Sequence, residues 1–297
     1  MTAAPVRNIM TLDVEDYMDA DPWRARPAAL PVSALVEEET HYVLDFLDEL
    51  DVRATCFVVG RVADALPGLV RELAARGHEI ATHGYHHVRM QFFSPAAFRE
   101  DLRRAVGVLG DLTGAQVRGF RAPGFSLRAE HGWAFDVMAA QGIVYDSSVR
   151  LVWPGGGQSG EALLARAAAA GIREVPGYKF GFGRFAAPLA GGGGLRMLPQ
   201  AITLWSIRRL NGRGIPVPIY VHPYDMAVER PSGPWRRSTP WGRAAMVLAH
   251  ALQRTGRRRV AAHLRRVVAL SGVMTMEEFV AQAPPPAAVP HGAAVIR

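Results

Sequence analysis

The chain has 297 residues, of which 49% are hydrophobic and 21% are charged. This length is enough for one large domain with a sizeable buried core, and the composition excludes an intrinsically disordered chain. No apolar run reaches the roughly 18 residues that a membrane span needs. The first residues lack the pattern of a secretory signal, and the single cysteine, Cys56, cannot form an internal disulfide. We therefore expect a soluble cytoplasmic protein.

The first half of the chain alternates strand and helix patterns, which is typical of an α/β fold. Short apolar or β-branched runs predict strands at residues 8–14, 54–60, 79–82, 116–121 and 143–146. Apolar side chains at helical spacing predict helices at residues 33–50, 67–76, 94–113 and 131–141. Cys56 lies inside an apolar strand, so we interpret it as a small core residue.

The pattern is looser after residue 148. We expect short strands at residues 172–176, 195–198 and 216–221, and loops at the segments 153–157 and 191–194. Residues 241–270 are predicted to be helical and basic, and residues 283–297 to be frayed.

The net charge of +7 is concentrated near the C-terminus, where ten arginines and no acidic residue lie between Arg230 and Met276. Such a stripe could bind nucleic acid, an anionic membrane or an acidic polysaccharide. It could equally be the solvated side of an amphipathic helix. We favour the solvated side because no nucleic-acid-binding module accompanies the stripe.

Residues able to carry chemistry stand at the C-terminal ends of the predicted strands, the ends that form the active-site face of a parallel α/β barrel. They are Asp13, Glu15, Asp16, His83, His87, Arg121, Asp146 and His222. Two imidazoles and a carboxylate form a zinc-type ligand set that leaves a coordination position open. A second carboxylate can act as general base and a further histidine as general acid. The set therefore predicts metal-assisted hydrolysis of an acyl bond.

Each of these features alone has a simpler interpretation. Most HxxxH pairs bind no metal, and His86 makes the choice within the histidine triplet ambiguous. The acids near residue 13 could be a solvated strand end, Arg121 a surface arginine and His222 a half-buried histidine. Their shared position at successive strand ends favours the catalytic interpretation.

Six segments resemble, in order, the motifs of NodB-type polysaccharide deacetylases, carbohydrate esterase family four. They are TLDVEDY at 11–17, ATCFVVG at 54–60, GHEIATHGYHH at 77–87, FRAPGFS at 120–126, YDSS at 145–148 and IYVHPYD at 219–225. The tail, through MTMEEF at 274–279, resembles the branch of this family found at exopolysaccharide loci of the exosortase type.

The resemblance implies a deformed (β/α)7 barrel at residues 8–230. A basic helical extension of the same domain follows at residues 231–282, and a flexible tail at 283–297. It also implies a divalent metal, most often zinc, and an N-acetylated amino-sugar polymer or lipid-linked glycan precursor as substrate. We hypothesise that the basic helix holds the enzyme near anionic lipid.

Carried over residue by residue, the resemblance makes Asp13 the base that deprotonates a water on the metal. His83 and His87 would be metal ligands. Arg121 would orient Asp13 and keep it ionised, and its loop would supply a backbone donor to the developing oxyanion.

The same resemblance makes His222 the acid that protonates the departing amine. Asp146 would lie near His222 and raise its pKa. Ser147 and Trp153 would contact the sugar near the mouth of the pocket.

The sequence departs from the family at one position. The common pattern has two adjacent aspartates, base then ligand, but Val14 follows Asp13 here. The metal carboxylate is therefore Glu15 or Asp16. Alternation along a strand puts Glu15 on the same face as Asp13, so we favour Glu15. Asp16 would serve if the strand ended in a bulge.

Two alternatives remain for the function. The first is a deacylase that acts on a non-polymeric amide, because the fold does not fix the substrate. The second is a non-catalytic carbohydrate-binding member of the fold, which would be signalled by loss of the base or of a histidine ligand. This chain retains Asp13, His83, His87 and His222.

Overall fold

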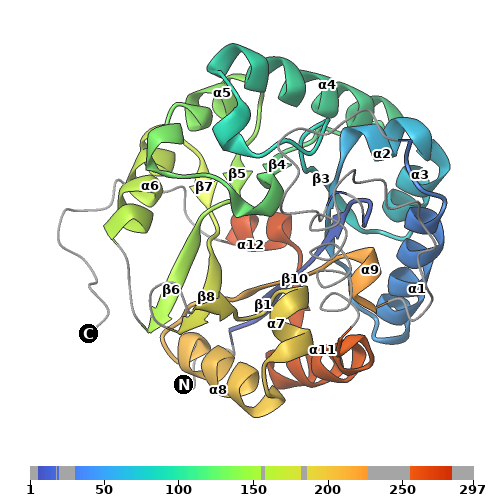
Figure 1. The fold of residues 1–297 in the computed structure, drawn as a ribbon, viewed down its shortest axis with the longest axis vertical. Helices are drawn as coiled ribbons and strands as arrows, with labels where there is room; N and C mark the ends of the chain where they lie inside the picture. Colours follow the sequence, from blue (N-terminus) through green and yellow to red (C-terminus); the bar gives the residue numbers. More distant parts are fainter. Residues whose placement is uncertain are drawn as a thin grey trace, which may run out of the picture.

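The computed structural model describes residues 6–17, 19, 31–154, 158–181, 186–226 and 255–282. Within them, parallel strands form one curled sheet in the order β10-β1-β2-β3-β4-β5-β7, and β11 also pairs with β1. The bounds are β1 Asn8–Val14, β2 Thr55–Val58, β3 Glu79–Thr82, β4 Gly119–Phe120, β5 Tyr145–Asp146, β7 Arg173–Glu174, β10 Pro218–Val221 and β11 Val273–Met274. The sheet is an open half-barrel with helices around its outside (Figure 1), which confirms the predicted α/β barrel class.

Strand β1 lies between β10 and β2 in this sheet, and its side chains alternate between two surroundings. Met10, Leu12 and Val14 belong to the main hydrophobic core, on the same side as buried residues of the first helix. Thr11 and Asp13 point the other way, into the barrel, where both contact Arg121. The strand thus aims one carboxylate at the interior and anchors itself by burial of the opposite face.

Helices cover the outer face of the sheet. Those of the first half are α1 Leu35–Glu49, α2 Gly60–Ala65, α3 Pro67–Ala75, α4 Pro95–Thr113, α5 Ala134–Ala140 and α6 Gln158–Ala169. The predicted start of α4 is confirmed, because the Ser94 hydroxyl accepts a hydrogen bond from the backbone N–H of Ala97. The end is equally local, since Gly114 adopts a left-handed conformation with φ of 67°.

A second, smaller sheet follows β5 in the chain. It contains β6 Arg150–Pro154, β8 Gly177–Gly181 and β9 Ala187–Pro188, with β6 parallel and β9 antiparallel to β8. The expected loop at 153–157 is therefore wrong at its first two residues, and its last three lie outside the described residues. Cys56 is fully buried in β2, as predicted for a small core residue.

The described residues of the C-terminal part form mainly helices, besides the strands β10 and β11. Its helices are α7 Gly192–Met197, α8 Gln200–Asn211, α9 Pro223–Met226, α11 Arg257–Ser271 and α12 Met276–Gln282. Helix α11 packs against α7 and α9, and β11 pairs with β1, so this region is built onto the barrel. The described part of the predicted basic helix is confirmed by α11; residues 227–254 and 283–297, including the predicted tail, lie outside the described residues.

The expected loop and strand over residues 191–198 are wrong, because α7 occupies most of this segment. A β-carbon at Gly192 would lie 1.7 Å from Asp225 Oδ2, and one at Gly194 would lie 1.9 Å from the Pro188 carbonyl oxygen. Glycine is a poor helix former. At positions 192 and 194 close packing leaves no space for a β-carbon and so requires glycine. The tertiary contacts of α7 therefore override the low helix propensity of its glycines.

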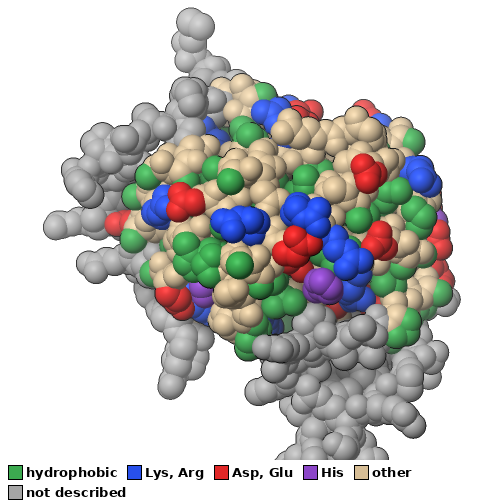
Figure 2. Space-filling model, turned by 90° about the horizontal axis from the view of Figure 1, so that it is seen from above, with side chains coloured by type: hydrophobic (Ala, Val, Ile, Leu, Met, Phe, Trp, Pro, Cys, Tyr) green, Lys and Arg blue, Asp and Glu red, His purple; other side chains and the backbone are tan. Residues whose placement is uncertain are grey.

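The arginines of α11 are only partly a solvated stripe. Arg257 and His263 are buried, and Arg265 forms an ion pair of 2.6 Å with Glu49 on α1. The face that carries α4 and α5, at the top of Figure 1 and away from α11, has interspersed cationic and acidic side chains (Figure 2). Among the described residues, no helix is both long and apolar enough to span a bilayer. Contact with an anionic membrane stays a prediction.

Candidate active site

Three predicted ligands converge at the C-terminal edge of the sheet. Glu15 follows β1, and His83 and His87 follow β3, which is separated from β1 by β2 alone. One ligand atom from each lies within 4.8 Å of the other two. Glu15 Oε2 is 2.6 Å from His87 Nε2 and 3.4 Å from His83 Nε2. This is a compact set of two imidazole nitrogens and one carboxylate oxygen.

A hydrogen bond on the side of the ring that faces away from Glu15 fixes the tautomer of His83. Its Nδ1–H donates to the backbone carbonyl of Arg121 at 2.7 Å, so Nε2 presents a lone pair to Glu15 and His87. His87 Nε2 is buried and makes no aligned hydrogen bond among the described residues. Its backbone is in the left-handed region with φ of 56°. Strain of this kind persists where the surroundings hold it in place, and it is concentrated at functional sites.

Helix α4 shapes the turn between the two histidines. The buried carboxylate of Asp101 accepts hydrogen bonds from the backbone N–H groups of Tyr85 and His86. It also accepts one from His86 Nδ1 at 2.7 Å, and the His86 side chain is half exposed. His86 is therefore turned away from Glu15. Of the three histidines, His83 and His87 therefore face Glu15, and His86 does not.

Asp13 and Arg121 form a fully buried ion pair next to this cluster. Arg121 Nη1 donates to Asp13 Oδ1 at 2.5 Å and to the Thr11 hydroxyl at 2.9 Å. Its other nitrogens donate to the carbonyl and hydroxyl oxygens of Ser147 at 3.3 and 3.1 Å. The guanidinium also lies 4.0 Å above the Phe57 ring. These contacts fix the orientation of the Arg121 guanidinium, and the guanidinium in turn fixes the position of Asp13 Oδ1.

His222 follows β10 and lies near Glu15 Oε1, whereas His83 and His87 lie near Glu15 Oε2. Its Nε2 is 3.8 Å from both Asp13 Oδ2 and Glu15 Oε1. Its Nδ1–H donates to Asp225 Oδ2 at 2.6 Å, and its backbone N–H donates to the same oxygen. Burial lowers the pKa of His222, but Asp225, Glu15 and Asp13 outweigh burial and raise the pKa to about 9.

The expectation that Asp146 lies near His222 and raises its pKa is wrong. Asp146 Oδ1 accepts a hydrogen bond of 2.5 Å from the Ser148 hydroxyl, and the neighbouring buried acid is Glu174. Burial raises the pKa of Asp146 and of Glu174. The pair braces the start of β6, because Glu174 also accepts the backbone N–H groups of Ser148 and Val149.

Asp225 is the residue that sequence reasoning missed. It sits three residues after His222 in the first turn of α9, a spacing that brings side chains together on a helix. Arg196 on α7 lies 3.1 Å from its other oxygen. Burial raises the pKa of Asp225, but His222 and Arg196 outweigh burial and lower it. In the sequence His-Pro-Tyr-Asp, the three-residue spacing of His222 and Asp225 predicts this contact if the segment is helical.

Tyr224 contacts both the ligand residue Glu15 and the general-acid candidate His222. Its hydroxyl donates to Glu15 Oε1 at 2.6 Å, and its ring stacks on His222 with centroids 4.9 Å apart. Burial raises the pKa of Glu15, but His87 and His222 outweigh burial, and the pKa lies well below its usual range. Glu15 is therefore held as a carboxylate.

Three other expected residues do not face the cluster. Asp16 Oδ2 accepts the backbone N–H of Ser33 at 2.7 Å, so Asp16 serves the approach to α1. Ser147 is fully buried and its hydroxyl donates to the Val175 carbonyl. Trp153 is 5% exposed and packs against Phe180. The expected sugar contacts of Ser147 and Trp153 are therefore wrong.

Two family models match the chain side by side. Residues 24–145 match the polysaccharide deacetylase family, and residues 153–280 match a domain of unknown function, DUF3473. The first match contains His83, His87 and Arg121, and the second contains His222 and Asp225. Strand β1, which precedes the first match, pairs with β2 of the first region and with β10 of the second, so the structure combines residues of both regions in one site.

Curated relatives are similar over shorter stretches. A peptidoglycan-N-acetylglucosamine deacetylase of Bacillus cereus is 31% identical over 33% of this chain and 36% of its own length. A chitooligosaccharide deacetylase of Sinorhizobium fredii is 38% identical over 28% of this chain and 40% of its own length. The matches thus span well under half of these relatives.

A solved structure of a putative polysaccharide deacetylase from Mycobacterium smegmatis shares the fold over nearly the whole chain. It covers 97% of both chains with a TM-score of 0.53 and 18% identity. The barrel, including its C-terminal part, is therefore a known architecture.

Proposed function

We propose that this chain, which carries a polysaccharide deacetylase domain, is a metal-dependent hydrolase that removes N-acetyl groups from an amino-sugar polymer or lipid-linked glycan precursor. The observation that carries the proposal is the placement of Asp13 and His222 next to the Glu15–His83–His87 cluster, with His222 Nε2 3.8 Å from both Asp13 Oδ2 and Glu15 Oε1. A general base and a general acid next to one metal-binding set is the arrangement that amide hydrolysis needs.

The donor set fits a divalent ion of the zinc type. Glu15, His83 and His87 would hold it, with His83 already in the tautomer that offers Nε2 and His87 Nε2 buried without an aligned partner. Two imidazoles and one carboxylate leave a coordination position open. When bound, such an ion polarises the acyl carbonyl and makes a nearby water more acidic.

Asp13 accepts the proton of the attacking water. Arg121 occupies its Oδ1, so Oδ2, which faces His222 Nε2, is the oxygen that remains for this role. In the loop after Arg121, the N–H groups of Ala122 and Phe125 are already donated to Ser148 and Ala122. Since proline has no N–H, Gly124 is the residue that would donate to the oxyanion.

His222 donates its Nε2 proton to the amine as the carbon–nitrogen bond breaks. Asp225 accepts the Nδ1–H, which orients the ring and stabilises its charged form. The pKa of about 9 keeps His222 protonated at neutral pH, as a general acid requires.

Replacement of Asp225 by asparagine is expected to shift the pH dependence of kcat. A general acid must be protonated, so wild-type activity falls as pH rises through the pKa of His222. Asp225→Asn removes the largest charge that raises this pKa, and the alkaline limb should move to lower pH by about one to two pH units. A kcat–pH profile measures this change.

Asp146→Asn is the matched control for that profile, because it neutralises the carboxylate that the sequence had paired with His222. Its alkaline limb should stay where the wild-type limb is. An equal shift in both variants would contradict the assignment of Asp225 as the positioning residue.

The proposed function is tested by metal content and acetate release on N-acetylglucosamine oligomers. We expect near-stoichiometric metal in the wild type. His83→Ala and Glu15→Gln should lose metal affinity by more than the roughly 10- to 100-fold that loss of an outer partner costs. Asp16→Asn is the control that should retain metal.

Each outcome separates the alternatives. Metal without acetate release would favour hydrolysis of a non-polymeric amide, and acetate release independent of metal would contradict the mechanism. Absence of metal after reconstitution would favour a non-catalytic carbohydrate-binding protein.

A further inference from the structure

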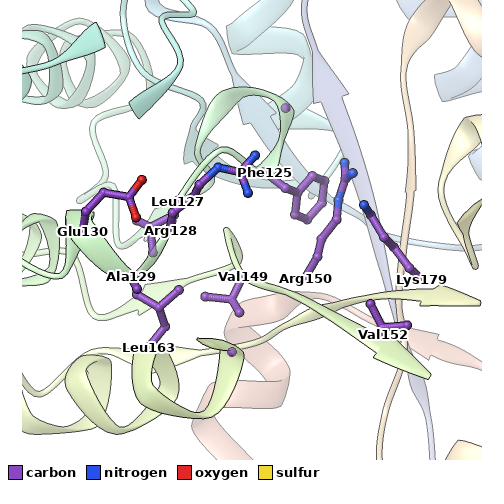
Figure 3. A pocket seen from close by; sticks show the side chains of 12 residues that line it. Phe125, Leu127, Arg128, Ala129, Glu130, Val149, Arg150, Val152, Leu163 and Lys179 are labelled. Carbon is purple, nitrogen blue, oxygen red and sulfur yellow. The ribbon is translucent and has the colours of Figure 1, made fainter. Parts of the chain in front are cut away.

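A cavity of about 320 Å³ lies beside the catalytic residues, between the loop after Arg121 and the strands β6 and β8. Figure 3 shows Arg150 and Lys179 extending side by side at one end of it and Arg128 near the middle. Lys179 is the only lysine of the chain. The cavity is therefore lined by three cations.

The sheet register explains why two of these cations share a face. Arg150 and Val152 alternate with Leu151 along β6, so both point to the same side. Lys179 on β8 is directly opposite Val152. The other side of β6 carries Leu151 and Trp153, which belong to the hydrophobic core or pack on it.

The positive charge in this cavity is not balanced. Within the part of the chain that the structure describes, no carboxylate oxygen forms an ion pair with Arg128, Arg150 or Lys179. Glu130 is the single acidic residue in the lining. Arg150 Nε is buried without a hydrogen-bond partner. Burial, followed by the charges of Arg150 and Arg128, lowers the pKa of Lys179.

One aromatic ring connects the cavity to the catalytic centre. The Arg150 guanidinium lies 4.2 Å above the Phe125 ring, and the Arg121 guanidinium lies 5.1 Å from the same ring. Phe125 also contacts Tyr220 at 4.8 Å between centroids, and Tyr220 lies 6.0 Å from His222. A group in the cavity is thus close enough to belong to the same substrate as the amide at Asp13.

We propose that this cavity binds an oxyanion, a phosphate or a carboxylate, that the glycan substrate carries next to the N-acetyl sugar. The inference rests on the proposed deacetylase function and names its substrate class as an acidic or phosphorylated amino-sugar glycan. The Arg150 guanidinium, which forms no ion pair among the described residues and lies over the Phe125 ring, is suited to bind two such oxygens at once. Val149, Val152 and Leu163 line the remainder, where the apolar face of a sugar ring fits.

The test is calorimetric titration of the protein as purified with inorganic phosphate and, separately, with glucuronate. Arg150→Gln and Lys179→Gln should each weaken binding about 10- to 100-fold. Glu130→Gln should strengthen it, because the repelling charge is removed. The matched control is Arg71→Gln, which removes one exposed cation on α3 and should leave binding unchanged. Thermal unfolding checks that every variant folds.

The two probes separate the sources of the oxyanion. Preference for phosphate would identify a phosphorylated or lipid-pyrophosphate-linked glycan, and preference for glucuronate would identify a uronate-containing glycan. Binding of neither probe would overturn the inference, and so would binding that Arg150→Gln and Lys179→Gln retain at wild-type strength, because the anion would then lie outside this cavity. Metal content of the wild type is measured in parallel. Absence of metal after reconstitution, with probe binding intact, would overturn the deacetylase function alone.

Discussion

Asp13→Asn is expected to lower the rate of amide hydrolysis by about 10²- to 10⁴-fold, the contribution of a general base. Asparagine keeps the shape of the side chain and can still accept a hydrogen bond from Arg121, but it cannot take a proton from water. Because Asp13 is not one of the three clustered ligand residues, metal content should stay at the wild-type level. Steady-state kinetics and metal analysis on the same sample measure both effects.

The comparison with Glu15→Gln makes this prediction specific. Both changes neutralise a buried carboxylate at the end of β1, yet only Glu15→Gln is expected to lose metal. A rate for Asp13→Asn within tenfold of the wild type would show that another group acts as the base. Loss of metal in Asp13→Asn would show that Asp13 is a ligand.

Arg121→Met is expected to destabilise the fold by about 3–5 kcal/mol as well as to lower activity strongly. Methionine fills much of the space but leaves Asp13 as an uncompensated buried charge. It also removes the donors to Thr11 and Ser147, which join β1, β4 and β5 inside the barrel. Urea denaturation of the wild type and the variant measures the free energy of unfolding.

The double variant Asp13→Asn with Arg121→Met tests the cause of that loss. If the unpaired carboxylate is responsible, the double variant should be more stable than Arg121→Met alone, because no buried charge is left without a partner. Effects that simply add would show that Arg121 stabilises the barrel through its neutral contacts instead. Activity should remain low in the double variant in either case.

Much of the barrel could be predicted from local sequence. The bounds of β1 and β3 agree with the expected 8–14 and 79–82, because each strand is a short segment with apolar or β-branched residues that is followed directly by polar residues, Glu15 after β1 and His83 after β3. Helix α7 could not be predicted, because its glycines are poor helix formers and are required by Asp225 and by the Pro188 carbonyl. That requirement exists only in the folded chain.

The candidate site shows the same division. Strand alternation was enough to favour Glu15 over Asp16, and the structure places Glu15 among the histidines. The predicted partner of His222 is wrong because the family resemblance implies an acid at the end of β5, whereas the acid that binds His222 is Asp225, one helical turn after it. Ser147 stands beside the site in sequence, but its oxygens are used to hold Arg121.

The pairing of β1 with β10 also has a consequence for biosynthesis. Thr11 and Ile219 are hydrogen-bonded across 208 positions of sequence, so one edge of β1 waits for a partner that the ribosome makes much later. At ordinary elongation rates, this interval lasts roughly 10–40 s. During it an apolar strand edge is exposed, which is a template for aggregation. The burial of Met10, Leu12 and Val14 beneath α1 covers one face of β1 but leaves this edge open until β10 emerges.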